Sequence, residues 1–269
     1  MSIIITVDDF GMSKGINAAI LTGIEKGIIT STNVMVNMPW SHEAKAIVET
    51  QRDCDVGIHL NITSGKPVSD KDTVLSLVDE NGCFYAYPIF KKRLRQKKIS
   101  KSEVKRELEA QIAKYRNTIG EPDYWNTHNH VHMLPELFKI FIDTARRHEL
   151  FVMRNNYKYP LTKKCHKPYV KNLLISFCMY YAKFNKMKYP SGMALFRDLK
   201  EKTNISTYLD SPIQYDKQIE VILHIADEVD SKFFGNLTQQ RIIEKQFLFS
   251  TEFQRYLETV SKCSFRDLV

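Results

Sequence analysis

Two short segments of the sequence hold side chains that could do chemistry together. Residues 7–11 read Val-Asp-Asp-Phe-Gly and place two adjacent carboxylates, Asp8 and Asp9, at the end of an apolar run. Residues 127–132 read Thr-His-Asn-His-Val-His and add three imidazoles. Acidic and imidazole side chains at strand ends are groups from which α/β enzymes build their active sites. We therefore expect the two segments to meet at one site.

A metal ion is the simplest reason to collect these groups. One carboxylate and two imidazoles form a common ligand set for a divalent cation, and such sets leave positions open for water and substrate. His59 lies near the end of a predicted strand, 56–61, and His128 follows another one. We therefore predict that Asp9, His59 and His128 bind one divalent metal ion. Because neighbouring residues of an extended strand point in opposite directions, Asp8 is expected to have a different role.

Two further histidines and an arginine complete the candidate site. His130 would share a face with His128 in an extended segment, and a helical turn after His128 would separate the two rings. His224 ends a late predicted strand, and Arg154 ends a short one, where it either pairs with Asp8 or lies at the surface. A lone histidine is more often structural, but four of them at strand ends beside an Asp-Asp pair favour a catalytic site.

The elements that must position these residues alternate between strand and helix. Apolar or β-branched runs predict strands, and amphipathic spacing with Ser13 and Ser102 as N-caps predicts helices. The predicted strands cover residues 3–7, 28–38, 56–61, 124–128, 150–153 and 220–224, and the other predicted helices cover 42–50, 135–148, 173–184 and 239–262. Short connections between alternating elements imply a parallel sheet. No G-x-G-x-x-G follows the first strand, so we predict a TIM-like (β/α) barrel, distorted or seven-stranded, rather than a doubly wound sheet.

The chain of 269 residues is expected to form a single α/β domain, 1–269, with an inserted helical segment. Within 155–207, residues 173–184 form a predicted helix rich in aromatic residues, which core packing explains most simply. A lid, a substrate wall or the contact surface of a homodimer are the alternatives.

Charge and composition narrow the class of protein. The net charge of +8 comes from residues 91–106, which hold nine basic residues and one acidic residue, so the rest of the chain is neutral. We interpret this segment as an amphipathic helix with a solvated face; a nucleic-acid-binding surface is the alternative, and no nucleic acid is expected as a partner. Five scattered cysteines without C-x-x-C argue against a disulfide framework or a thiolate zinc site. No leader or membrane-spanning stretch is visible, so we expect a cytoplasmic protein without a membrane partner.

Four blocks of sequence follow one another along the chain. They are VDDFGMSKGIN (7–17), TSTNVMVN (30–37), GIHLNIT (57–63) and HNHVHMLP (128–135). Together they resemble the YdjC-like carbohydrate deacetylases, the family of the chitooligosaccharide deacetylases. The similarity covers roughly residues 3–154, and beyond them it rests mainly on the strand that ends at His224.

The resemblance implies a TIM-like barrel and removal of the acetyl group from an N-acetylated mono- or oligosaccharide. It implies one divalent metal ion, Mg²⁺ or Zn²⁺, on Asp9, His59 and His128, and it makes Asp8 the general base. The departing amine then needs a proton, for which we favour His224 over His130. Hydrolysis of another ester or of a phosphoester on the same metal site is the alternative function.

Several positions depart from the family pattern. Many relatives carry His and Asp where this chain has Tyr124 and Asn126, and His-Pro-Gly where it has His-Ile-Ala at 224–226. An amide cannot act as a charged hydrogen-bond acceptor for an imidazole. Asn126 is therefore expected to weaken the affinity for metal.

Overall fold

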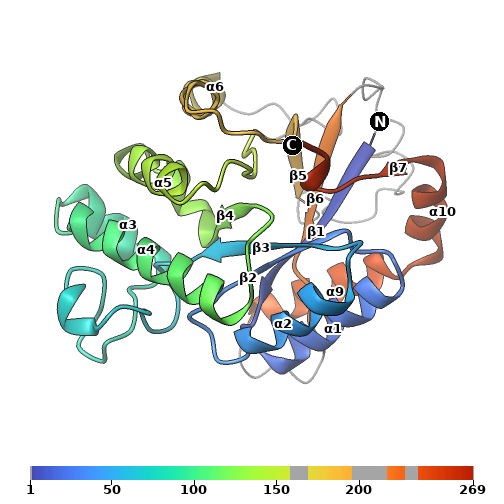
Figure 1. The fold of residues 1–269 in the computed structure, drawn as a ribbon, viewed down its shortest axis with the longest axis horizontal. Helices are drawn as coiled ribbons and strands as arrows, with labels where there is room; N and C mark the ends of the chain where they lie inside the picture. Colours follow the sequence, from blue (N-terminus) through green and yellow to red (C-terminus); the bar gives the residue numbers. More distant parts are fainter. Residues whose placement is uncertain (1, 158–168, 196–216, 228–235, 269) are drawn as a thin grey trace.

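Parallel strands form one sheet at the centre of the structure (Figure 1). The computed structural model describes residues 2–157, 169–195, 217–227 and 236–268. Along the sheet the order is β4-β3-β2-β1-β6-β5, and the short β7 pairs with the start of β1. The strands are β1 (Ser2–Phe10), β2 (Ser31–Val34), β3 (Asp55–Leu60), β4 (Trp125–Thr127), β5 (Gly192–Leu195), β6 (Gln218–Leu223) and β7 (Ser261–Lys262). All of these pairings are parallel, as alternating strands and helices predict.

β1 lies in the middle of the sheet because its side chains can be buried on both faces. Residues 3–7 and Phe10 are almost completely buried. A parallel strand covered on both faces reads as a continuous apolar run rather than an alternating one. β6 pairs with β1 from Ser2 to Val7, and β2 pairs with its second half. The carboxyl end of β1 therefore lies between the carboxyl ends of two neighbouring strands.

Most helices lie where the sequence predicts them. They are α1 (Lys14–Glu25), α2 (Ala44–Thr50), α3 (Tyr87–Arg95), α4 (Lys101–Thr118), α5 (Pro135–Arg147), α6 (Tyr169–Phe184), α9 (Asn236–Leu248) and α10 (Thr251–Thr259). Ser13 is the N-cap of α1, and its hydroxyl accepts from the Ile16 N–H at 3.1 Å, as predicted. α4 packs against β3 and α5, and α6 packs against α5 (Figure 1). Among the described helices, none combines the length and the apolar character that crossing a bilayer requires.

The prediction of a parallel α/β fold is confirmed, but the sheet is not a complete TIM barrel. Its continuous ladders end at β4 on one side and at β5 on the other. Between these edges the described residues form only two isolated parallel bridges, Trp125↔Met153 and Val152↔Lys188. The predicted strand 150–153 therefore does not form a continuous ladder; it contributes only single bridges at Val152 and Met153. A distorted barrel is compatible with this arrangement.

The basic segment 91–106 is not one helix. The amphipathic helix predicted after Ser102 is present as α4, but the prediction of Ser102 as its N-cap is wrong. α3 ends at Arg95, and Lys97 adopts a φ of +56° in the turn that follows. Ser100 caps α4 instead, with its hydroxyl accepting from the Glu103 N–H at 3.4 Å. The basic residues are therefore divided between the end of one helix and the start of the next.

The predicted insertion 155–207 is described only in part. Residues 158–168 and 196–207 of it lie outside the described residues, as does Cys165. The predicted helix 173–184 is present within the longer α6. Core packing explains one side of this helix, where Ile175, Cys178, Met179 and Ala182 are buried.

The C-terminal segment packs against the amino ends of the strands, at the edge of the sheet opposite to Asp9, His59 and His128. Phe265 is fully buried and stacks on Tyr124, with ring centroids 3.8 Å apart. On the other side of the Tyr124 ring, a Cβ atom added to Gly57 would lie 2.5 Å from the ring. The Tyr124 hydroxyl accepts from Ser31 Oγ at 2.8 Å and donates to the Thr32 carbonyl at 3.1 Å. Tyr124 is therefore a packing residue of β3 and β2 rather than a site residue.

We predict that Phe265→Ala destabilises the fold by about 3–5 kcal/mol, because it removes a large buried ring and leaves a cavity beside Tyr124. Urea unfolding measures this change in the free energy of unfolding. Phe184→Ala is the matched control, since Phe184 is 80% exposed, and its effect should stay within about 0.5 kcal/mol. Equal effects of the two substitutions would contradict the packing role of Phe265.

Candidate metal centre and active site

A bulge at the end of β1 sends Asp8 and Asp9 in different directions. Between Val7 and Phe10, β1 holds one more residue than the facing part of β2. Asp9 adopts a φ of +74°, a left-handed conformation that disfavours a residue with a Cβ atom by roughly 1–2 kcal/mol. Bulges re-aim side chains next to active sites. Here the bulge turns Asp9 toward β3 and β4, while Asp8 faces Arg154.

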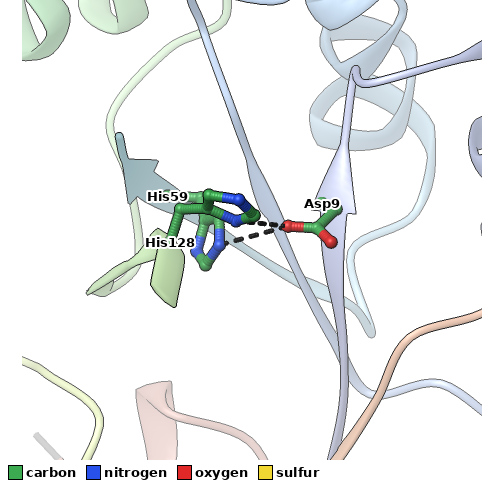
Figure 2. A group of neighbouring side chains, drawn as sticks. All are labelled: Asp9, His59 and His128. Carbon is green, nitrogen blue, oxygen red and sulfur yellow. Dashed lines mark hydrogen bonds and ion pairs between the residues drawn. The ribbon is translucent and has the colours of Figure 1, made fainter. Parts of the chain in front are cut away.

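Asp9, His59 and His128 come together at the carboxyl edge of the sheet (Figure 2). Asp9 Oδ1 lies 3.3 Å from His59 Nε2 and 3.0 Å from His128 Nδ1. One potential ligand atom from each of the three residues lies within 4.8 Å of the other two. Two ligands held at about 2.1 Å from a common ion in tetrahedral or octahedral geometry lie roughly 3.0–3.4 Å apart. The donor types and their spacing therefore fit a single divalent metal ion.

Asp9 is held in its ionised form, which is the form that binds a metal. Burial by itself would raise the pKa of this carboxyl, but Arg241 and His128 outweigh burial and hold the pKa well below its ordinary value. Arg241 of α9 donates to Asp9 Oδ2 at 2.5 Å. One oxygen of Asp9 thus faces the two imidazoles, and the other is fixed by an arginine.

Asp8 forms a fully buried ion-pair network with Arg154 and Glu220. Arg154 donates to both oxygens of Asp8 at 2.7 Å and to both oxygens of Glu220 at 2.7–3.0 Å. Asn33 Nδ2 donates to Asp8 Oδ1 at 2.6 Å. Burial would raise the pKa of Asp8, but the Arg154 guanidinium outweighs it and holds that pKa well below its ordinary range. The predicted pairing of Arg154 with Asp8 is present, and the alternative of a surface arginine is wrong.

His224 follows β6 and points toward Asp8. Its Nε2 lies 3.9 Å from Asp8 Oδ2, and its Nδ1 lies 3.8 Å from Glu244 Oε2. Burial lowers the pKa of this imidazole, but Glu244, Asp9 and Asp8 together raise it above the ordinary value. The side chain is 31% exposed. A protonated imidazole here can both reach a ligand and donate a proton to it.

The three histidines of 128–132 have separate environments, because the chain turns into a 3₁₀ segment, His128–Met133. His130 adopts a φ of +52°, and burial together with Arg154 lowers its pKa well below the ordinary value. His132 is fully buried and packs edge-on against the rings of Trp125 and Phe141, with Nδ1 2.5 Å from Thr127 Oγ1. Only His128 of the three joins the metal cluster, as the alternative of a helical turn predicts.

The Asn126 amide joins the metal cluster to the buried ion pair. Oriented by its neighbours, its oxygen accepts from Arg154 Nη2 and from Asn33 Nδ2, both at 2.9 Å, and its nitrogen donates to His59 Nδ1 at 2.5 Å. The proton of the neutral His59 ring then lies on Nε2, the atom that faces Asp9. A metal on Nε2 requires the opposite tautomer, with Nδ1 donating to an oxygen. This conflict is the physical reason to expect that asparagine at 126 lowers the affinity for metal.

A cavity of about 870 Å³ opens in front of these groups. Asp8, Asp9, His59, His128, His130 and His224 all line it. Gln240, Arg241 and Glu244 of α9 line the same space, as do Lys91 and Arg95 of α3. The volume is large enough for a small-molecule ligand of several rings.

Three residues of this site, Glu220, Arg241 and Glu244, were not identified from the sequence. Arg241 and Glu244 belong to a helix near the C-terminus, and no motif distinguishes them there from other charged residues of the helix. Glu220 offers a signal, because it is a single acid within the otherwise apolar run 219–223, and a buried acid needs a partner. That signal points to an arginine such as Arg154, but only the fold identifies it.

The comparison with known sequences decides the family. Residues 2–259 match the family described as YdjC-like protein. The chain belongs to the YdjC-like family.

Several curated relatives of this YdjC-like protein are carbohydrate deacetylases. One from Clostridium beijerinckii is 34% identical over 150 residues, which are 56% of this chain and 58% of that protein. One from Geobacillus stearothermophilus is 35% identical over 147 residues, 55% of this chain and 57% of that protein. A chitooligosaccharide deacetylase from Serratia marcescens is 31% identical over 139 residues, 51% of this chain and 53% of that protein. The chain thus spans a little over half the length of these curated relatives.

A solved structure agrees with the fold over the whole chain. It is a proposed cellobiose-phosphate cleavage protein from Enterococcus faecalis V583, with a TM-score of 0.80 and 24% sequence identity. The match covers 100% of this chain and 98% of that one. At this identity the similarity establishes the fold of the YdjC-like protein and nothing about its ligand.

We predict that acid destabilises the fold partly through His132. Burial lowers its pKa from 6.5 to about 3, so below pH 6.5 the unfolded chain binds a proton that the folded chain does not. Stability present at neutral pH is therefore lost as pH falls from 6.5 toward 3, by about 1.4 kcal/mol per pH unit at most. Urea unfolding at pH 7 and pH 5 should show a smaller loss for His132→Gln than for the native chain. The exposed His42 provides the control, and a His42→Gln variant that flattens the pH dependence equally would contradict the assignment.

Proposed function

We propose that this YdjC-like protein is a metal-dependent hydrolase that removes the acetyl group from N-acetylated sugars or chitooligosaccharides. The observation that carries the proposal is the meeting of Asp9, His59 and His128 beside the ion pair of Asp8 and Arg154. The names of its curated relatives, carbohydrate deacetylase and chitooligosaccharide deacetylase, support it. An N-acetylated mono- or oligosaccharide is then the substrate.

Asp9, His59 and His128 would hold the metal ion, either Mg²⁺ or Zn²⁺. Bound there, such an ion lowers the pKa of a water molecule and polarises an amide carbonyl. Asp9 is suited to this role because its carboxylate is ionised and its orientation is fixed on both oxygens. One imidazole comes from β3 and the other from the segment that follows β4, so the ligand set closes only in the folded chain.

Asp8 is the proposed general base. Arg154 keeps it ionised at neutral pH, so it is ready to accept a proton from the attacking water. The same pair fixes the orientation of the carboxylate, because both Arg154 contacts are at 2.7 Å. The ion pair with Arg154 also makes Asp8 a weaker base, so Asp8 would hold an accepted proton only briefly before releasing it.

His224 is the proposed general acid, and its distance from Asp8 supports the pairing of the two roles. Its raised pKa favours the imidazolium form, which can protonate the departing amine of the sugar. His130 is the second choice. Its lowered pKa keeps it neutral near pH 7, so it is the weaker proton donor. The opposite pKa shifts of these two histidines favour His224.

The alternative functions have less support. A two-metal phosphoesterase needs a second set of ligands close by. Among the described residues, Asp9, His59 and His128 form the one group of His, Cys, Asp or Glu side chains with metal-binding spacing. The nucleic-acid alternative relied on one basic helix at 91–106, and that segment is divided between α3 and α4.

We predict that chelation abolishes acetate release from N-acetylglucosamine oligomers and that added Mg²⁺ or Zn²⁺ restores it. Asp9→Ala should remove metal binding and activity together, because it deletes the ligand that faces both imidazoles. Asp8→Asn should leave metal binding intact and lower kcat by about 100- to 10,000-fold, the contribution of a general base. Acetate assays and metal titration of both variants separate the two roles. Undiminished acetate release in the presence of chelator would refute the proposed mechanism.

We also predict that Asn126→Asp raises metal affinity by about tenfold or more, because a carboxylate accepts from His59 Nδ1 in the tautomer that frees Nε2. Calorimetric titration with Zn²⁺ measures the change. Asn129→Asp is the matched control, since Asn129 lies beside His128 but contacts Thr63 rather than an imidazole. Equal gains from both substitutions would mean that added negative charge, not the hydrogen bond, raises the affinity.

A further inference from the structure

α6 presents a row of large apolar side chains to solvent. Leu173, Phe177, Tyr180 and Phe184 are 70–80% exposed. Their spacing of four, three and four residues places them on one face of the helix. Burial of such side chains is favourable, so a contiguous exposed row indicates a contact surface. We name these four residues the α6 row.

The same helix forms part of the wall of the active-site cavity. Leu174, Ile175 and Cys178 of α6 line it, and Met133 and Met193 continue the wall from neighbouring segments. These side chains offer no strong hydrogen-bonding group, so sugar hydroxyls placed against them would lose contacts with water and gain none. A hydrocarbon chain has no such penalty. Leu174 is 51% exposed and lines the cavity, so the apolar wall continues onto the surface of α6.

The charged residues of the α6 segment itself favour an anionic partner. Residues 169–195 contain four lysines and no aspartate or glutamate. Lys183 is exposed in the last turn of α6, and Lys186 and Lys188 are exposed just after it. Lys91 and Arg95 line the same cavity from α3, within the segment that gives the chain its net charge of +8. A second copy of the chain would bring these like charges together, whereas an anionic lipid surface would neutralise them.

We propose that α6 lies in the surface of an anionic membrane and that the substrate is an N-acetylated sugar linked to a lipid. The lipid chain would occupy the aliphatic wall of the cavity and leave it across Leu174, beside the α6 row. The part of the proposal that concerns the substrate rests on the proposed deacetylase function. An amphipathic helix with aromatic and leucine residues on one side and lysines nearby is suited to lie on a bilayer without crossing it. The sequence predicts no membrane partner because it contains no segment long enough to span a bilayer. Binding at the surface of a bilayer needs no such segment.

Sedimentation of the full chain with lipid vesicles tests the membrane surface without any assay of activity. Vesicles of equal parts phosphatidylcholine and phosphatidylglycerol should bind the protein, and vesicles of phosphatidylcholine alone should bind it weakly. The double variant Phe177→Ser/Phe184→Ser should lose about tenfold in vesicle affinity, because two apolar side chains no longer insert. Leu75→Ser is the matched control, since Leu75 is 63% exposed but lies outside α6. Circular dichroism and light scattering establish that each variant is folded and report its oligomeric state.

Failure of the native chain to bind anionic vesicles would overturn the membrane proposal. So would a native dimer that becomes monomeric in the double variant, since that result would assign the α6 row to a second copy. Loss of vesicle binding in Leu75→Ser to the same degree would also overturn it.

Acetate release then tests the substrate. The native protein should act faster on an undecaprenyl-diphosphate-linked N-acetylglucosamine in anionic vesicles than on soluble N-acetylglucosamine oligomers. The double variant should lose this advantage and keep its rate on the soluble oligomers, because neither phenylalanine lines the cavity. Acetate release from soluble oligomers without preference for the lipid-linked sugar would refute the lipid substrate and leave the deacetylase function standing. No acetate release from either substrate would refute the deacetylase function, and vesicle binding would still decide the role of α6.

Discussion

A buried arginine holds the two central strands of the site together. Arg154 has no exposed surface and pairs with Asp8 of β1 and Glu220 of β6. A buried charge is strongly unfavourable without a partner, and each of these acids is buried as well. Loss of Arg154 would leave two buried carboxylates without a counter-charge. The network therefore fixes the direction of the Asp8 side chain. Because Asp9 is the next residue, the network also limits the directions in which the Asp9 side chain can point.

The metal cluster depends on this arrangement and on the order of the strands. β1, β2, β3 and β4 are successive neighbours in the sheet, so Asp9, His59 and His128 reach one another across the ends of parallel strands. α9 completes the arrangement from the other side, with Arg241 on Asp9 and Glu244 on His224. Chemistry at the carboxyl edge of the sheet is what parallel α/β folds generally provide.

The sequence predicted the parts of the fold and site that depend on local pattern. Strand-end acids and histidines, the N-cap at Ser13 and the parallel sheet follow from periodicity and residue type, and the structure contains them. The predicted TIM-like barrel is present only in a distorted form, because Val152 and Met153 pair through single bridges, which hydrophobic pattern does not distinguish from a ladder. Arg241 and Glu244 were missed because helix register alone does not say which side chains turn inward. The roles of Asp8, His224 and the three metal ligands stay predictions, which the distances between these side chains support.

Two left-handed residues, Asp9 and Gly11, flank Phe10 where β1 ends. At Gly11, with φ of +96°, an added Cβ atom would lie 2.9 Å from Ser41 Cα, so the chain passes through this turn with no spare room. Side chains of a strand alternate between its two faces, so gaining or losing one residue here would exchange the faces. Such a change would turn the Asp9 carboxylate away from His59 and His128, although every residue of the site would still be present. The length of this turn is therefore as restrictive for the evolution of the protein as the identity of its acids.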